Sequence, residues 1–321
     1  MSNIKASVVI PTKNPGPIFR DVLDAVMSQQ TEWDYEVIVI DSGSKDGTVE
    51  FVKARSGVRL IEIAPQDFGH GRTRNDAVAA AQGEYVAVIT HDAQPAERDW
   101  LQSLVDVADA DERIAGVFGK HIAYPQASVF TTHELELHFS GFLVDPIVSL
   151  DDRARYDSDV GYRQFLHFFS DNNALLRKSV WEKIPYPDVD FAEDQSWAKL
   201  IIEAGYLKAY SERGAVYHSH DYSLFERLQR SFDESYAFKR FFGYILCPGI
   251  KPMMRSFMAL SRRDVAYARS LGMLRRQPVK VVHAVLDNFM RLLGHYLGSR
   301  GEKVPEFLRL KISRDKKLFA Q

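Results

Sequence analysis

The sequence predicts an α/β fold, in which helices flank a mostly parallel sheet and a helical C-terminal extension follows. Three observations lead to this prediction. Over about the first 90 residues, short apolar runs alternate with segments of helical periodicity, as in sheets built with crossover helices. Polar, glycine-rich segments follow the apolar runs, where parallel strands end and ligands bind. The last hundred or so residues carry amphipathic segments with an excess of Lys and Arg.

The first part of the chain supplies the regular alternation. Apolar runs predict strands over 6–11, 35–40, 58–64 and 85–90, and helices are expected from Pro17 and over 72–81. Pro17 suits a helix start, and Phe19, Leu23 and Val26 then share one face. Further along, we expect strands near 114–122, 167–176 and 215–217, and helices over 193–204 and from Ser223 to Pro248.

Charge divides the chain. Residues 1–224 hold 21 basic and 35 acidic residues, a net charge of −14, whereas residues 225–321 hold 20 and 8, a net charge of +12. A chain of 321 residues has room for one large α/β domain and an appendage. We therefore expect a domain over 1–224 and a basic helical region over 225–321.

Targeting signals are weak. Cys247 is the single cysteine, so it has no partner within the chain for a disulfide. The N-terminus lacks the apolar core of a secretory signal, and no apolar run approaches the roughly 18 residues of a spanning helix. These features lead us to expect a cytoplasmic protein.

Polar clusters stand where predicted strands end or where a helix begins. They are Asp41–Asp46, Thr90–Asp92, Glu193-Asp194 and His218–His220. A single Asp at a strand end is more often a turn former than a ligand. Several such clusters on one predicted sheet favour a ligand site at its carboxyl edge.

Several strings resemble the family-2 glycosyltransferases of the GT-A fold. They are SVVIPTKN at 7–14, EVIVIDSGSKDGT at 36–48 and VITHDA at 88–93, with FAEDQSWAKLIIEAGY at 191–206 similar to the family's acidic base motif and VYHSHDYS at 216–223 to its late histidine. The resemblance covers roughly residues 5–225. Within the family, FGHGRTRNDAV at 68–78 and SDNNALLRKSVWEKIPYPD at 170–188 look most like bacterial rhamnosyltransferases of surface polysaccharide synthesis.

The resemblance implies a GT-A fold and an inverting transfer of a sugar, with dTDP-rhamnose the favoured donor and a glycan or lipid-linked glycan the acceptor. It assigns the nucleotide-sugar half to residues 1 to about 115 and the acceptor half to about 116–224. Asp41 is implied to bind the nucleotide base, and Pro11, Thr12 and Asn14 to line the same pocket. Ser44 either joins them or only shapes the loop.

A divalent cation suits this chemistry, because it neutralises the charge that develops on a diphosphate leaving group. Carboxylates are ligands for Mg²⁺ or Mn²⁺, and imidazole is an additional ligand for Mn²⁺. We expect Asp92, His218 and His220 to bind the metal. The sequence departs from the usual Asp-x-Asp motif, since Thr90 stands where the first carboxylate is expected. The alternative for the two histidines is a polar turn after a strand.

Arg72 and Arg74 begin a predicted helix, where the helix dipole disfavours cations. A bound phosphate would resolve the conflict, so we expect both to bind the diphosphate and the adjacent Asn75 to orient sugar or phosphate. The alternative is two solvated surface arginines.

Inverting transfer needs a base near the acceptor hydroxyl. Glu193 and Asp194 are adjacent in a helix and point about 100° apart, so only one can serve. Family analogy favours Asp194 as the base, with Glu193 anchoring the loop. The alternative is a pair of acids that stabilise a helix start.

Two other functions are weaker. A nucleotidyltransferase would need a glycine-rich phosphate loop after its first strand, and only Gly16 is there. A catalytically silent, nucleotide-binding scaffold of a polysaccharide assembly complex is supported by Thr90 and opposed by Asp194 and His218.

The basic tail suggests a membrane surface. Apolar residues recur at spacings of three and four in Val282, Val285, Leu286, Phe289, Leu293 and Tyr296, which predicts an amphipathic helix. We expect it to hold the enzyme peripherally on an anionic membrane; the alternative is a helix packed on the catalytic domain. Nucleic acid is not expected as a partner, because the acidic domain would oppose it.

Overall fold

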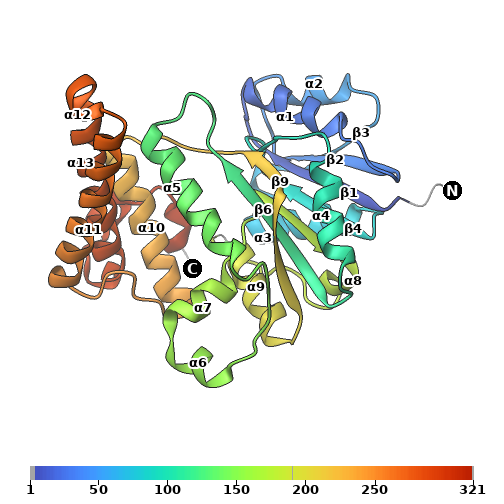
Figure 1. Ribbon diagram of the computed structural model, residues 1–321. Coiled ribbons are helices and arrows are strands. Elements are labelled where there is room, and N and C mark those ends of the chain that lie inside the picture. The colour runs from blue at the N-terminus through green and yellow to red at the C-terminus, as the bar shows by residue number, and fades with distance from the viewer. Residues whose placement is uncertain (1–3, 190, 320–321) are drawn as a thin grey trace. The chain divides into compact units, whose positions relative to one another are not determined.

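The computed structural model describes residues 4–189 and 191–319. The chain forms two compact units, Met1–Ser219 and His220–Gln321. In the first unit, the described residues build a nine-stranded sheet in the order β3-β2-β1-β4-β8-β6-β9-β5, with β7 beside β9 (Figure 1). The strands are β1 (Ala6–Thr12), β2 (Tyr35–Asp41), β3 (Val58–Glu62), β4 (Tyr85–Ile89), β5 (Gln94–Pro95), β6 (Ile114–Ile122), β7 (Ile147–Val148), β8 (Asn173–Arg177) and β9 (Leu207–Tyr217).

The directions of the strands bring most of their carboxyl ends to one edge of the sheet. β1 is parallel to β2 and β4, β2 to β3, and β6 to β9. β8 is antiparallel to both β4 and β6, so β6 and β9 run in the same direction as β4. The carboxyl ends of β1, β2, β3, β4, β6 and β9 therefore meet at one edge of the sheet, together with the start of β8.

Both faces of the sheet are buried, as in parallel sheets generally. Along β1, Val8 and Ile10 face one hydrophobic cluster and Val9 faces another. The first cluster includes α1 (Ile18–Met27), α2 (Thr48–Lys53) and α4 (Trp100–Asp109). The second includes α3 (His70–Ala80), α5 (Val129–Ser140), α6 (Arg153–Ser158), α7 (Val160–His167), α8 (Lys178–Trp181) and α9 (Glu193–Glu203). The predicted α/β architecture is confirmed.

The second unit is helical. It contains α10 (Leu224–Phe242), α11 (Ile250–Ser270), α12 (Met273–Arg276), α13 (Pro278–Gly298) and α14 (Glu306–Ile312). Gly294 and Gly298 lie one turn apart on α13 and let the backbones of α13 and α10 come close. A Cβ on Gly294 would lie 2.5 Å from the Leu228 carbonyl oxygen, and one on Gly298 2.3 Å from that of Phe232.

Several expected elements differ. The strand expected over 167–176 is shorter, because α7 continues to His167 and β8 begins only at Asn173. β9 begins at Leu207, well before the expected 215. The long helix expected to reach Pro248 ends at Phe242, where Gly243 adopts φ 71° and caps it.

The apolar stripe expected to face a membrane is largely used inside the second unit. On α13, Phe289 and Tyr296 pack with Met253 of α11, and Leu293 packs with Phe232 of α10. Most of α13 therefore packs on α10 and α11 within the second unit. Val282 and Leu286 of the stripe are exposed. Among the described residues, no helix has the length and apolarity to span a bilayer.

Candidate active site

The topology gathers the predicted site residues at one edge. Thr12 and Asp41 end the neighbouring strands β1 and β2 and are paired in register. Asp92 follows the end of β4, and His218 follows the end of β9. Ile89 at the end of β4 pairs with Asn173 at the start of β8, so Asp171 lies at the same edge.

Asp41 fixes the loop between β2 and α2. Only 1% exposed, it accepts four hydrogen bonds. Oδ1 accepts from the backbone N–H groups of Gly43 (2.9 Å) and Ser44 (2.8 Å), and Oδ2 from the hydroxyls of Thr12 (2.8 Å) and Ser44 (2.5 Å). These bonds fill the capacity of a carboxylate. A nucleotide base that binds Asp41 therefore requires the Ser44 hydroxyl to turn to another acceptor.

The end of β1 is bound to the same loop. The Asn14 backbone N–H donates to Ser44 Oγ (2.7 Å), and Asn14 Oδ1 accepts from the Lys45 N–H (2.7 Å). Asn14 adopts φ 45°, a left-handed conformation that Asn tolerates better than most residues. Pro11 lies just past Val9, the last residue of β1 that pairs with β4. Its missing N–H therefore leaves that pairing intact.

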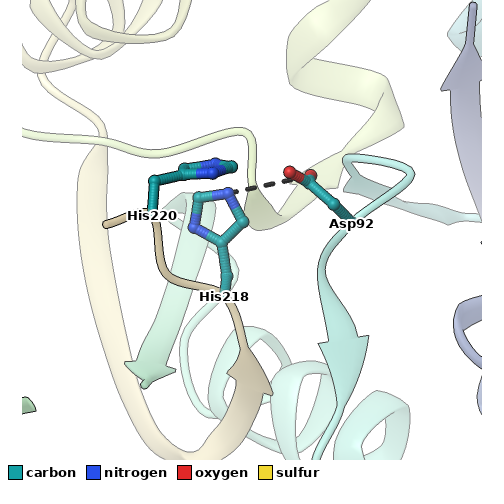
Figure 2. A group of neighbouring side chains, drawn as sticks. All are labelled: Asp92, His218 and His220. Carbon is teal, nitrogen blue, oxygen red and sulfur yellow. Dashed lines mark ion pairs between the residues drawn. The ribbon is translucent and has the colours of Figure 1, made fainter. Parts of the chain in front are cut away.

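A two-residue strand brings Asp92 and His218 together. β5 begins two residues after Asp92 and pairs with the end of β9, with Gln94 opposite Tyr217. His218 is the next residue, and its Nε2 lies 3.7 Å from Asp92 Oδ1. Figure 2 shows these two residues together with His220. The three side chains offer ligand atoms that all lie within 4.8 Å of one another.

The three donors fit a divalent cation. Metal–ligand bonds of about 2.1 Å give ligand–ligand distances of about 3 Å (cis) to 4.2 Å (trans) in an octahedral site. The 3.7 Å between Asp92 and His218 lies in this range, and the 4.8 Å that bounds all three separations lies slightly above it, so a cation would draw the three donors slightly together. Asp92 is partly buried, His218 is 9% exposed and His220 is exposed. One oxygen and two nitrogen donors suit Mn²⁺ better than Mg²⁺, which prefers oxygen.

Buried charges surround the start of α9. Arg74 of α3, with a side chain 8% exposed, contacts Asp171 Oδ2 through Nε at 2.8 Å and Glu193 Oε1 through Nη1 at 2.7 Å. Asp171 also accepts from the Tyr186 hydroxyl at 2.7 Å. The Asp171 backbone N–H donates to Asp194 Oδ2 at 3.3 Å, which links Asp194 to the same group. We call Arg74, Asp171, Tyr186, Glu193 and Asp194 the acidic cluster.

One guanidinium faces three carboxyls in this cluster. Burial raises the pKa of Asp171 to about 7, with Glu193 adding to the shift and Arg74 opposing it. Burial also raises the pKa of Asp194 well above its usual value, and the charges of Glu193 and Asp171 raise it further. For Arg74, burial acts to lower the pKa, but Glu193 and Asp171 outweigh it and keep the guanidinium charged. The cluster therefore binds protons near neutral pH.

The two adjacent acids have different surroundings. Glu193 is buried and paired with Arg74, whereas Asp194 is partly exposed and accepts from the Gln195 N–H at 2.7 Å. Ala192, just before them, adopts φ 54° and ψ 35°, an unfavourable conformation for a residue with a Cβ. Such strain is common at functional sites and here directs the chain into α9.

The structure gives the residues at the start of α3 other partners than those expected. Arg74 lies inside, against carboxylates, and Arg72 is exposed with its guanidinium 3.0 Å from Asp188. Asn75 bonds to the Tyr186 backbone N–H and carbonyl and to the Trp181 indole. A Cβ on Gly71 would lie 2.0 Å from the Pro187 carbonyl oxygen, so this helix start packs closely against the chain there. Arg74 and Asn75 thus organise the acidic cluster and its loop.

Sequence reasoning missed Asp171, Tyr186 and His121. His121 of β6 is 7% exposed, its ring centroid lies 5.2 Å from that of His218, and its Nε2 has no hydrogen-bond partner among the described atoms. Burial lowers the pKa of His121 well below its usual value, so the ring is neutral. Asp171 lies within the segment 170–188 that resembles rhamnosyltransferases, but a single Asp in that segment gives no sequence pattern that would mark it as a site residue.

Solved structures share this architecture. A mannosyltransferase from Pyrobaculum calidifontis, PcManGT, in complex with GDP-Man and Mn²⁺ aligns with a TM-score of 0.58 at 16% identity, over 94% of this chain and 88% of that one. S. aureus TarS 1-349 in complex with UDP aligns with a TM-score of 0.53 at 17% identity, over 91% of each chain. At these identities the likeness shows the fold, which is GT-A-like.

The family model described as glycosyl transferase family 2 matches residues 7–184, and the chain belongs to this family. It is 31% identical over 307 residues to the O-antigen chain rhamnosyltransferase RfbN of Salmonella typhimurium, covering 94% of this chain and 92% of that protein. It is 26% identical over 304 residues to the O-antigen chain rhamnosyltransferase WbaN of Salmonella anatum, covering 93% and 90%. The protein is therefore a glycosyltransferase, as the resemblance implied.

Proposed function

We propose that this enzyme transfers rhamnose from dTDP-rhamnose to a hydroxyl of a glycan or lipid-linked glycan, with inversion at the anomeric carbon. The observation that carries the proposal is one sheet edge with a nucleotide-type loop, a three-donor metal group and the partly exposed carboxyl of Asp194. Two relatives named as rhamnosyltransferases, each matched over about nine-tenths of both chains, support rhamnose.

The loop held by Asp41 is the proposed site for the nucleotide base. Thr12 and Ser44 both donate to Asp41, and the Asn14 backbone N–H donates to Ser44, so the loop is preorganised before ligand binds. Exchange of the Ser44 hydroxyl for a base N–H on Asp41 costs one internal hydrogen bond and forms another. Arg72 is the exposed arginine at the start of α3 and remains a candidate for a phosphate contact.

Asp92, His218 and His220 are proposed to hold Mn²⁺ or Mg²⁺, with Mn²⁺ favoured by the two imidazoles. The bound cation would offset the negative charge that develops on the diphosphate as the sugar leaves. Thr90 replaces a carboxylate beside this group, and the histidines supply the donors that a second carboxylate would otherwise provide. The chain's own contribution is to hold Asp92 beside His218 through the β5–β9 pairing.

Asp194 is proposed to accept the proton of the acceptor hydroxyl. Its partial exposure and raised pKa suit a base, since a carboxylate whose pKa is raised takes up a proton more strongly than an ordinary one. Glu193 is proposed as a positioning residue, because its carboxylate is engaged by Arg74. The charge of Glu193 beside Asp194 helps to keep the latter basic.

Thermal shift with a panel of nucleotides tests the donor and the metal together, because a ligand of the native state raises its stability. We expect dTDP-rhamnose with Mn²⁺ to raise the melting temperature more than UDP-glucose, UDP-galactose or GDP-mannose. Asp92→Ala should abolish the Mn²⁺-dependent part of the shift. A larger shift with a UDP-hexose would overturn the assignment of dTDP-rhamnose as the donor. A shift that does not depend on metal would overturn the assignment of Asp92, His218 and His220 as metal ligands.

A silent nucleotide-binding scaffold is the rival function. It predicts the same thermal shifts but no consumption of donor. Donor hydrolysis without acceptor, lost in Asp194→Asn, would exclude it. We also propose a cytoplasmic location beside the membrane, where a lipid-linked acceptor resides.

A further inference from the structure

α12 lies at the turn of the hairpin formed by α11 and α13 (Figure 1). Apolar side chains are exposed at this turn. We call residues 269–282 the hairpin tip. Its exposed apolar side chains are Leu271 (43% exposed), Leu274 (37%), Val279 (79%) and Val282 (59%). The inward positions Met273 and Val281 are buried, so the tip has an interior of its own. The exposed side chains are therefore not needed to fill it.

The same segment carries only one sign of charge. Between Asp264 and Asp287 the sequence has no Asp or Glu, but it has Arg269, Arg275, Arg276 and Lys280. All four are exposed, and no carboxylate in the described part of the chain forms an ion pair with any of them. Elsewhere on the hairpin, Arg263 pairs with Asp264 and Arg291 with Asp287. Lys251, Arg255 and Arg262 of α11 are also exposed. What distinguishes the tip is that its four cations stand together with exposed apolar side chains and no carboxylate in between.

Exposed apolar side chains among unpaired cations suit one kind of surface. We propose that the hairpin tip docks on an anionic lipid bilayer, with Leu274, Val279 and Val282 entering the headgroup–acyl boundary and the basic side chains contacting lipid phosphates. The inference takes from the proposed function only a reason to be at a membrane, namely a lipid-linked acceptor. A nucleic acid would satisfy the cations but would leave the apolar side chains in water.

The structure thereby moves the membrane contact. The stripe of α13 expected from the sequence is mostly packed on α10 and α11, and only its N-terminal end at Val282 and the adjacent Leu286 remains open. The contact is therefore the turn of the hairpin and the first turns of α13, not a whole helix lying flat. Contact through a tip of a few residues gives reversible, salt-sensitive binding.

Vesicle binding by the full chain tests the tip. Vesicles of phosphatidylglycerol and phosphatidylcholine are compared with phosphatidylcholine alone, at low and high salt, without donor. Arg275→Gln/Arg276→Gln should weaken binding on the order of 25-fold, taking about fivefold for each basic residue. Val279→Ser/Val282→Ser, at exposed positions that do not affect the core, should weaken it roughly tenfold.

The matched control is Lys303→Gln/Lys311→Gln, which removes two exposed positive charges from the same unit outside the tip. It should change binding less than about threefold. Three results would overturn the proposal: no binding to phosphatidylglycerol vesicles at low salt, an equal loss in the control, or preference for a nucleic acid duplex with no effect of the valine changes. Donor thermal shifts of the same variants should match the parent. If the protein binds donor but not vesicles, the membrane proposal for the hairpin tip is wrong and the proposed function is unaffected.

Discussion

Replacement of Arg74 with methionine removes the guanidinium from the acidic cluster while keeping an unbranched side chain of similar length. In the native protein this group lies 2.8 Å from Asp171 and 2.7 Å from Glu193, and its side chain is 8% exposed. Removing one partner of such a buried pair leaves carboxylates without a counter-charge and typically costs about 3–5 kcal/mol. For a unit of this size that lowers the melting temperature by about 6–20 °C.

Arg72→Met is the matched control, because it removes the same group two residues away. The Arg72 side chain is 53% exposed and makes an exposed ion pair with Asp188, whose loss costs at most about 1 kcal/mol. The comparison also separates two roles. If an arginine binds a donor phosphate, its replacement should lower donor affinity with little change in stability. If it is a buried counter-charge, its replacement should lower the stability of the fold first.

The loss of folding stability caused by Arg74→Met should depend on pH. Burial already raises the pKa of Asp171 to about 7, and loss of the guanidinium raises it further. The folded variant then keeps protons that the unfolded chain releases above about pH 4, so stability falls as pH rises through this window. Calorimetry at pH 5.5 and 8.5 should show the larger loss at pH 8.5. If Arg74→Met melts like the parent at pH 8.5, the buried cluster does not exist as described.

The remaining predictions concern catalysis, metal and packing. Asp194→Asn should lower kcat by about 10² to 10⁴-fold with little change in donor KM, whereas Glu193→Gln should mainly lower stability; the reverse outcome would exchange their roles. EDTA should abolish turnover, with Mn²⁺ restoring more activity than Mg²⁺ and His218→Ala losing the response to both; full activity in EDTA contradicts the metal group. The acid limb of the pH–kcat profile should lie well above pH 4, because burial and neighbouring carboxylates raise the pKa of Asp194, and a limb near pH 4 would contradict this. Gly298→Ala should destabilise the helical unit by about 1–3 kcal/mol, because the new Cβ meets the Phe232 carbonyl. Gly141→Ala, at φ −62° and with no atom within 4 Å of the new Cβ, should cost less, and equal losses would be evidence against close packing of α10 and α13.

The parallel part of the fold could be predicted because its signal is local. β1 and β2 are continuous apolar runs, and the polar residues that follow them can hardly continue a buried strand. β9 was underestimated because Ser211, Glu212 and Arg213 interrupt its apolar pattern. Ser211 pairs with Gly119 of β6, a strand far away in sequence, whereas Glu212 and Arg213 lie where the register of that pairing shifts.

The sequence predicted which residues belong to the site better than it predicted their contacts. Asp92 and His218 were selected by resemblance, but they meet because β5 pairs with β9, and a two-residue strand leaves no sequence pattern. Arg74 was expected to face a phosphate, because a bound anion would offset the unfavourable placement of a cation at a helix start. Its burial depends on Asp171 and Glu193, which are about a hundred residues away.

The first-formed product of donor hydrolysis tests the central claim most directly. Purified full-length enzyme, Mn²⁺ and dTDP-rhamnose are followed by proton NMR without acceptor, before the free sugar can interconvert between its anomers. We predict rhamnose of inverted anomeric configuration, faster consumption than with UDP-glucose or UDP-galactose, and at least about a hundredfold slower turnover in Asp194→Asn. A retained configuration, equal use of a UDP-hexose, or no turnover at all would contradict the account.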